Sequence, residues 1–320
     1  MERLTLRPQP VVSPLHAAFD AFLLSREAMR CTPKTLQHYC YTVGGFVAYL
    51  DSQGIRDARD ITPGHIRAYL VALQRRGTKD TTQHAHARGI KTWCRWLVAE
   101  GDLAENPMQR VAMPRLDKRV PPPFSPDDVK ALLDACDRHT PRGSRDYALV
   151  LTLLDTGLRA SEVIGLRVGD IDPRSGLCTI MGKGRKVRQV RAGAKARAAI
   201  VRMLGYRRDV VPNAATNGAP LWVGYDVQGR EKGALTPYGL QAVLRRLGAR
   251  AGVSPCSPHR FRRTFALWCL RDGMDLHSLR LLMGHSDLAV LQRYLALAGE
   301  DIERAHAAHS PADRLLNERG

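Results

Sequence analysis

The sequence predicts a mainly α-helical protein of two domains that also contains a small antiparallel β-sheet. Helical periodicity fills residues 14–100, a basic proline-rich segment interrupts it, and a short β region lies within the helical second half. The 320 residues, 44% of them hydrophobic, suffice for a core in each of two domains. We expect domains at 12–106 and 125–304, a linker at 107–124 and a tail at 305–320.

The first domain is expected to be helical throughout. Thr32 and Thr62 each precede a proline, which is typical of a capping residue followed by the first helical position. Trp93 and Trp96 lie on an apolar stripe and are predicted to be core residues. The predicted helices are near 14–28, 34–52, 63–75 and 79–100.

The second domain is predicted to begin with SPDD at 125–128, where serine caps a helix and acidic residues occupy its first turn. An apolar helix follows and ends at Gly157. Strands at 177–182 and 186–191 are joined by a glycine turn as a hairpin. The chain is then expected to be helical again from residue 235 to about residue 298.

The charge of the chain points to nucleic acid as its partner. Its 49 Lys and Arg outnumber 31 acidic residues, which gives a formal net charge of +18. A protein this basic usually meets a polyanion. A cationic surface without a partner is the alternative, and clustering of the charge at 184–191, 245–250 and 259–263 argues against it.

Several other classes are disfavoured by the sequence. It has no apolar run long enough to span a bilayer and no signal peptide. Its seven cysteines never form a CxxC pair, so neither disulfides nor a zinc site is expected, and a reducing cytoplasm fits. We interpret His84 and His86 as solvated helix surface rather than metal ligands, because no ligand motif accompanies them.

Two segments carry a cation beside a turn. In TGLRASEVIGL, Arg159 begins a helix, and a helix N-terminus with a guanidinium is suited to binding phosphate. Alternatively, Arg159 is a surface residue that pairs with Glu162. In MGKGRKVRQV, Lys183 lies at the hairpin turn, where a lysine among other cations can act as a general acid. A simple phosphate contact or a solvated turn residue is the alternative there.

The segment SPHRFRRTFA is predicted to start a helix with two faces. Phe261 and Phe265 should face the core, as should Trp268 one turn later. His259 and Arg262 are three residues apart and share another face. This pattern fits a reaction centre, although a helix that lies on a DNA backbone would also produce it.

The segment LLMGHSDLAVLQRYLAL contains a histidine at a corner and a tyrosine on the following helix. Gly284 ends one helix, His285 occupies the corner, and Tyr294 lies beside the apolar stripe of the next helix. Taken alone, Tyr294 is a residue at the boundary of the core.

Together these residue types fit one reaction, the attack of a phenol on a phosphodiester. Two guanidiniums can neutralise the charge of the transition state, and a lysine can protonate the leaving oxygen. Imidazoles can bind the phosphate and help to manage the phenol proton, because a phenol is a poor nucleophile without assistance. This chemistry needs no metal, ATP or other cofactor.

From residue 14 to residue 294, the chain resembles the tyrosine recombinases of the phage integrase family. The matching motifs are TGLRASE, GKGRKVR, HxxR and LMGH, followed nine residues later by the tyrosine. The catalytic residues that the resemblance implies are Arg159, Lys183, His259, Arg262, His285 and Tyr294, with Glu162 as supporting acid.

The resemblance also implies a fold and partners. It implies a helical SAM-like core-binding domain and a catalytic domain that clamp double-stranded DNA at inverted-repeat core sites. It further implies a homo-tetramer on two DNA sites, with an accessory protein or partner recombinase in some relatives, in the bacterial cytoplasm at the nucleoid. The predicted DNA contacts are Arg115, Lys118, Arg119, Lys186, Arg188, Arg245, Arg246, Arg260 and Arg263.

The chain departs from many relatives at two positions, since it has Arg260 and Arg263 around the second catalytic arginine. We expect these arginines to make extra phosphate contacts. Two other functions share parts of this pattern: a type IB topoisomerase, and a non-catalytic DNA-binding regulator. Retention of the tyrosine, lysine and arginines disfavours the regulator, and the separate N-terminal domain and the tail disfavour the topoisomerase.

Overall fold

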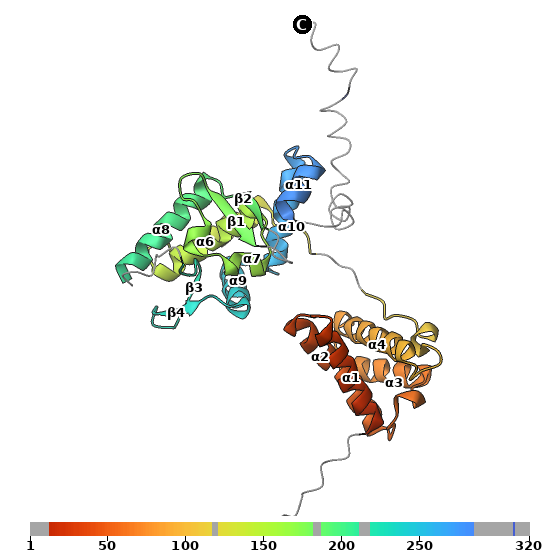
Figure 1. Cartoon of the computed structure of the whole chain (residues 1–320). Helices are drawn as coiled ribbons and strands as arrows, with labels where there is room; N and C mark the ends of the chain where they lie inside the picture. The colour runs from red at the N-terminus through yellow and green to blue at the C-terminus, as the bar shows by residue number, and fades with distance from the viewer. Residues whose placement is uncertain (1–12, 117–120, 182–186, 211–217, 285–309, 311–320) are drawn as a thin grey trace, which may run out of the picture. The chain divides into compact units, whose positions relative to one another are not determined.

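The computed structural model describes residues 13–116, 121–181, 187–210 and 218–284, together with Ser310. The chain divides into two compact units, Met1–Arg119 and Val120–Gly320. We call them the N-terminal unit and, after the role that the resemblance implies for it, the catalytic unit, and each is considered by itself (Figure 1). In the described parts of both units, no helix is long and apolar enough to cross a bilayer.

The described part of the N-terminal unit is helical, as predicted. The Thr32 and Thr62 hydroxyls accept hydrogen bonds from backbone N–H groups in the first turns of α2 and α3, so both predicted caps are confirmed. The elements are α1 (Pro14–Ala28), α2 (Pro33–Ser52), η1 (Ala58–Asp60), α3 (Pro63–Arg75), α4 (Asp80–Glu100) and η2 (Pro107–Arg110).

Aromatic and aliphatic side chains fill the core of this unit. Trp93 is fully buried and Trp96 packs at the margin of the core, which confirms the predicted stripe. The α2 and α4 helices approach closely at Gly89, where an added Cβ would lie 2.3 Å from the Thr42 hydroxyl oxygen. A larger residue at this position would therefore push the two helices apart.

The prediction that His84 and His86 lie on a solvated surface is wrong for His86. This residue is 3% exposed, and its Nδ1 lies 2.9 Å from the Tyr69 hydroxyl and 3.1 Å from the Thr42 carbonyl oxygen. Burial lowers the pKa of His86 below its usual value. The side chain is thus a neutral member of a buried polar cluster.

The catalytic unit combines helices with two small sheets. The β1–β2 hairpin is antiparallel with Leu177 opposite Arg191, as predicted, whereas the β3–β4 pair was not predicted. The elements are α5 (Pro126–Asp134), α6 (Pro141–Thr156), α7 (Ala160–Gly165), η3 (Val168–Asp170), β1 (Leu177–Met181), β2 (Val187–Arg191), α8 (Ala194–Val210), β3 (Val223–Tyr225), β4 (Glu231–Ala234), α9 (Pro237–Ala251), α10 (Pro258–Arg271) and α11 (Leu276–Met283).

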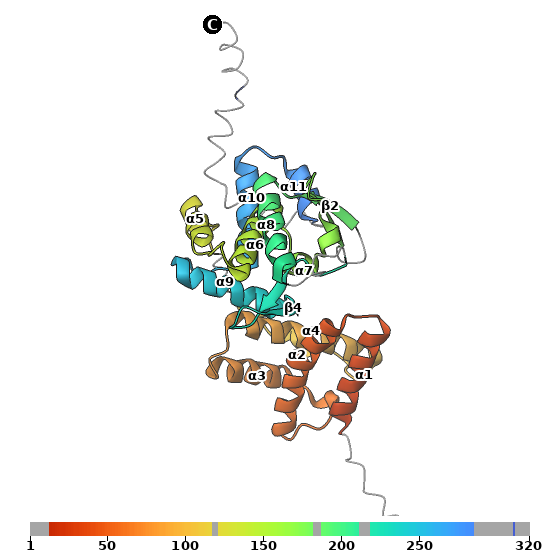
Figure 2. The ribbon, with the colours of Figure 1, turned by 90° about the vertical axis from the view of Figure 1, so that its left-hand side faces the viewer.

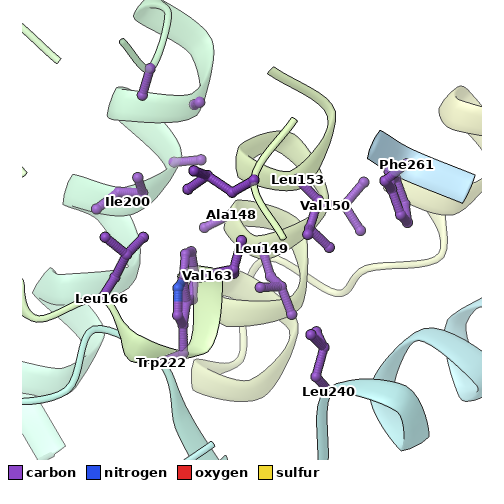
Figure 3. Packing of buried hydrophobic residues seen from close by; sticks show 14 of the residues in the cluster. Ala148, Leu149, Val150, Leu153, Val163, Leu166, Ile200, Trp222, Leu240 and Phe261 are labelled. Carbon is purple, nitrogen blue, oxygen red and sulfur yellow. The ribbon is translucent and has the colours of Figure 1, made fainter. Parts of the chain in front are cut away.

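The α6 helix runs through the centre of the catalytic unit, with α8 and α10 packed against it (Figure 2). Its Leu149 and Leu153 are fully buried in a cluster that also includes Trp222 (Figure 3). A smaller cluster joins α10 to α11 through Phe265 and Met283. This packing fixes α10 and the end of α11 relative to α6, and these are the elements that carry the site.

Both ends of the predicted linker at 107–124 belong to a folded unit. Met108 and Val111 lie in the core of the N-terminal unit, and Phe124 lies in the core of the catalytic unit. These three side chains are apolar, and their burial in the two cores anchors both ends of the segment. Lys118 and Arg119 lie outside the described residues.

Candidate active site

The turn after α6 places Arg159 at the start of α7. Gly157 ends α6 with φ 57°, a left-handed conformation that favours glycine. An added Cβ on Gly157 would also lie 2.2 Å from the Phe265 ring, so α10 packs directly against this turn. The predicted position of Arg159 at the beginning of a helix is confirmed.

Glu162 binds two parts of Arg159. One Glu162 oxygen accepts a hydrogen bond of 2.8 Å from the Arg159 backbone N–H, and the other accepts one of 2.9 Å from its guanidinium. This is the acid-at-N3 arrangement that stabilises the first turn of a helix. The predicted Arg159–Glu162 pair therefore forms, and the Arg159 side chain remains 40% exposed.

A third group, Arg188 on β2, also binds this carboxylate. Its two terminal nitrogens donate to the two Glu162 oxygens at 2.8 Å each, which is the two-pronged pairing that arginine favours. Burial alone raises the pKa of Glu162, but hydrogen bonds from Arg188 and from the Arg159 backbone outweigh it and lower the pKa to about 2. Glu162 is therefore a stable anion between two cations.

Arg262 on α10 reaches the same region from another side. Its guanidinium donates to the Gly157 carbonyl and, at 2.7 Å, to the Met283 carbonyl. The side chain is buried in the catalytic unit, at 5% exposure. Arg262 thus joins the turn after α6 to the end of α11, which lies beside α10 and β2 (Figures 1 and 2).

Three arginines bind three consecutive carbonyl oxygens at the end of α11. Arg188 Nε donates to Leu282 at 3.2 Å, and Arg262 donates to Met283. Arg159 donates to Gly284 at 2.9 Å. Carbonyls at a helix C-terminus lack partners within the helix and carry partial negative charge, so guanidiniums are suited to them. We call this group the arginine cap of α11.

The arginine cap lies directly before the predicted histidine corner. Gly284 adopts φ 60°, and an added Cβ would lie 3.0 Å from the Arg188 guanidinium, so glycine suits this position. His285 and Tyr294 follow outside the described residues, as does Lys183. The structure therefore brings together Arg159, Arg262 and Glu162 of the predicted catalytic set.

His259 differs from Arg262 in its surroundings. It is exposed at the start of α10, after the N-cap Ser257 and Pro258, whereas Arg262 is buried. The side of the helix that was predicted to face the core does so, with Phe261 fully buried. His259 and Arg262 do not share one exposed face in this structure.

The predicted DNA contact of Arg260 is corrected by its burial. The residue is 7% exposed, and its guanidinium stacks on Phe124 at 4.1 Å from the ring centre. It also donates to the Pro122 carbonyl at 2.9 Å and to Asp128 at 3.0 Å. Arg260 therefore anchors the end of the linker segment to α10 instead of reaching a phosphate.

The other predicted DNA contacts fall into three groups. Arg188 is corrected too, because it binds Glu162 and its side chain is only 16% exposed. Arg263 donates to the Pro121 carbonyl, and Arg246 pairs with Asp146 at 3.1 Å. Arg115 and Arg245 are exposed, and Lys186 lies outside the described residues.

Sequence reasoning missed the inward orientation of Arg188, because the two valines of β2 lie three residues apart and face opposite sides of the strand. Val190 is buried on this strand, and side chains two residues apart point to the same face. Similarly, Arg260 shares a helix face with buried Thr264 and Leu267. The structure therefore places both arginines on inward faces that the apolar pattern alone does not identify.

The described arginines and Glu162 can bind an anion. Three guanidiniums and one carboxylate leave an excess of positive charge at the end of α11, and a phosphate is attracted to such a site. Among the described residues, no group of three or more His, Cys, Asp or Glu side chains is placed to hold a metal ion.

Two family models cover most of the chain. The phage integrase family matches residues 123–300, and the N-terminal SAM-like domain of phage integrases matches residues 19–101. The chain is 30% identical over 278 residues to the tyrosine recombinase XerC of Bacillus licheniformis, covering 87% of this chain and 90% of the relative. It is 29% identical to XerC of Xanthomonas campestris pv. campestris over 301 residues, covering 93% and 90%.

Solved structures share the fold. The integrase of transposon Tn1549 in complex with a circular intermediate DNA has a TM-score of 0.70 at 17% identity, covering 91% of this chain and 99% of that one. A lambda integrase dimer bound to a COC′ core site has a TM-score of 0.66 at 17% identity, covering 85% and 95%. With the family models and the curated relatives, these findings show that the chain belongs to the phage integrase family and is a tyrosine recombinase, an enzyme of site-specific DNA recombination.

Proposed function

We propose that the chain cuts and rejoins DNA through a covalent bond between Tyr294 and the 3′ phosphate of the broken strand. Arg159 and Arg262 neutralise the phosphate in the transition state, and Lys183 protonates the leaving 5′ oxygen. His259 and His285 bind the phosphate and assist the tyrosine proton. Glu162 orients Arg159.

One observation carries this proposal: Arg159 and Arg262 come from separate elements and meet at neighbouring carbonyls at the end of α11. A phosphodiester under attack gains negative charge on its non-bridging oxygens, and donors fixed in advance stabilise that charge most strongly. The end of α11 immediately precedes His285 in the sequence, and Tyr294 follows nine residues later. The carbonyls that the arginine pair binds therefore stand directly before His285, the proposed phosphate contact, in the sequence.

The partner that we propose is double-stranded DNA with inverted-repeat core sites. The net charge of +18 favours a polyanion, and the solved relatives include complexes with core-site and circular intermediate DNA. We further propose a homo-tetramer that exchanges strands in pairs through a Holliday junction. Residues 12–106 form the core-binding domain, 125–304 the catalytic domain, and 305–320 a tail that contacts a neighbouring subunit. The candidate purposes are integration and excision, transposition, and resolution of chromosome dimers.

The test begins by selecting a binding site from a random duplex library with the intact chain. A nicked form of that duplex then traps any covalent protein–DNA adduct, which is counted after denaturation. We expect wild type and Tyr238→Phe to form the adduct, because Tyr238 is an 85% exposed tyrosine of the same unit. Tyr294→Phe should bind the duplex and form none. An adduct from Tyr294→Phe would remove this residue as the nucleophile.

A second measurement distinguishes recombination from simple relaxation. Two plasmids that carry the selected site should exchange strands, and a crosslinker should capture a tetramer on paired sites. Relaxation of a supercoiled plasmid that lacks the site, by a monomer, would instead support the topoisomerase function.

A further inference from the structure

Arg188 differs from Arg159, the other arginine that binds Glu162, because it faces inward and is almost covered. Its side chain is 16% exposed, against 40% for Arg159. It stands on the same face of β2 as buried Val190. Because three of its nitrogens donate to Glu162 and the Leu282 carbonyl, a direct role at a DNA phosphate would require it to leave these partners.

The charge balance around Glu162 suggests another role. Glu162 carries one negative charge and contacts two guanidiniums, so the Arg159–Glu162–Arg188 group keeps one positive charge in total. Without Arg188, the remaining Arg159–Glu162 pair would be neutral. A neutral pair attracts a phosphate weakly and stabilises its transition-state charge little.

We propose that Arg188 is a positioning residue that neutralises Glu162, so that the charge of the exposed Arg159 remains available for the scissile phosphate. This inference rests on the proposed function, in which Arg159 acts on the phosphate. Arg188 also holds the Leu282 carbonyl and lies against Gly284, so the same side chain fixes the backbone that leads into the histidine corner. It acts through Glu162 and this backbone and does not touch DNA.

The first measurement compares Arg188→Gln with Arg191→Gln, an exposed arginine on the same strand that loses the same charge. Cleavage of the nicked duplex is followed in a single turnover at saturating DNA. Because Arg188 supports a catalytic group, we expect Arg188→Gln to cleave about 10- to 100-fold more slowly. Its DNA affinity should stay within about threefold of wild type, with an unchanged dependence on salt. Arg191→Gln should cleave at the wild-type rate once DNA is saturating.

A phosphate contact predicts the opposite pattern. Loss of such a contact weakens binding and lowers the slope of log affinity against log salt by about one. If Arg188→Gln shows that pattern and cleaves normally at saturation, the proposal is overturned.

The second measurement distinguishes charge balance from a structural role. In Arg188→Gln/Glu162→Gln, the uncompensated carboxylate is gone and Arg159 recovers its net positive charge. We therefore expect the double variant to cleave faster than Arg188→Gln, which independent structural losses would not produce. A double variant that is slower than Arg188→Gln contradicts the proposal. Arg188→Lys retains the charge and should cleave faster than Arg188→Gln. If Arg188→Gln does not fold, Arg188→Lys is compared with wild type and Arg159→Gln, and a rate as low as that of Arg159→Gln contradicts the proposal.

Failure of the inference and failure of the proposed function give different results. Arg159→Gln is run in the same assay and should lose nearly all cleavage. If Arg159→Gln cleaves like wild type, the proposed role of Arg159 fails and the inference fails with it. If Arg159→Gln is inactive while Arg188→Gln is normal, only the inference fails.

Discussion

The two units of the molecule bury different kinds of side chain. Among the described residues, the buried polar side chains of the N-terminal unit are Thr42 and His86, and aromatic and aliphatic groups surround them. The described part of the catalytic unit buries four arginines and two acids: Arg145, Arg207, Arg260, Arg262, Asp146 and Glu162.

The difference concerns the free-energy cost of burying charged groups and the fixed geometry that such groups provide. Burying a charge is unfavourable unless a partner compensates for it, so charges inside a domain add little net stability. They do fix geometry, because a guanidinium accepts few arrangements of its partners. The described core of the N-terminal unit is therefore mainly apolar, whereas the catalytic unit holds its buried guanidiniums in fixed positions through their partners.

The largest expected effect comes from removing one cation of the arginine cap. Because the proposed function assigns Arg262 to the charge of the transition state, we expect Arg262→Gln to lower single-turnover cleavage about 100- to 1000-fold. DNA affinity should fall by less than about tenfold, since ground-state binding uses many other charges. Arg250→Gln removes an exposed charge of α9 and should leave the cleavage rate unchanged. Equal losses of affinity and rate in Arg262→Gln would contradict this expectation.

A pair of core substitutions compares the two units directly. Arg145→Met leaves Asp146 buried with a weaker set of partners and should lower the free energy of unfolding by about 3–5 kcal/mol. Leu97→Ala opens a cavity in the N-terminal unit and should cost about 2–5 kcal/mol. Urea unfolding measures both. If Arg145→Met is as stable as wild type, the buried charges of the catalytic unit do not depend on their partners as we describe.

Acid should destabilise the two units in different pH ranges. His86 has a lowered pKa when folded, so its unit loses stability as pH falls through 6.5, the usual value, because the unfolded chain then binds more protons. The pKa of Glu162 is usually 4.5 and is about 2 in the folded chain, so its contribution to the free energy of unfolding is lost only as pH falls from 4.5 to about 2. That contribution is at most about 3 kcal/mol. The measurement is the free energy of unfolding as a function of pH. The loss of stability below pH 6.5 should be absent in His86→Gln, and the loss between the two pKa values of Glu162 should be absent in Glu162→Gln.

The smallest effect is expected for Arg260. Arg260→Gln should lower the free energy of unfolding by about 1–3 kcal/mol, because the Pro122 carbonyl and Asp128 lose a charged donor. The affinity of Arg260→Gln for DNA should depend on salt concentration as that of wild type does. Arg115→Gln is the matched comparison, and it should lower the salt slope by about one if exposed Arg115 contacts a phosphate. The reverse result would restore the DNA contact predicted for Arg260.

Local signals predicted most of the fold. The caps at Thr32, Thr62 and Ser125, and the glycine after α6, each depend on residues within one turn, so the sequence states them directly. The β3–β4 pair was missed because strands of three and four residues are too short to show an alternating pattern.

The errors concern charged or polar residues whose partners are distant in the sequence. Arg188 binds a carboxylate 26 positions away, and Arg260 binds a carbonyl 138 positions away. No local pattern states such a pairing, so both were assigned to the surface by their charge. The Arg159–Glu162 pair was predicted because its members are three residues apart. Short-range electrostatics can be predicted from sequence, whereas long-range compensation of buried charge needs the fold.

The position of the arginine cap in the sequence also has a consequence for the order in which we expect the site to form during synthesis. Its donors come from the start of α7, from β2 and from α10, and its acceptors are the last two residues of α11 and Gly284, which follows them. A growing chain that ends before Leu282 has the arginines but lacks the carbonyls that align them. Alignment of these cations therefore comes late in synthesis, after the core around α6 can already form. We therefore expect a truncated chain to hold Arg159 through Glu162 and Arg262 through the Gly157 carbonyl, without the contacts that bring the two guanidiniums to neighbouring carbonyls.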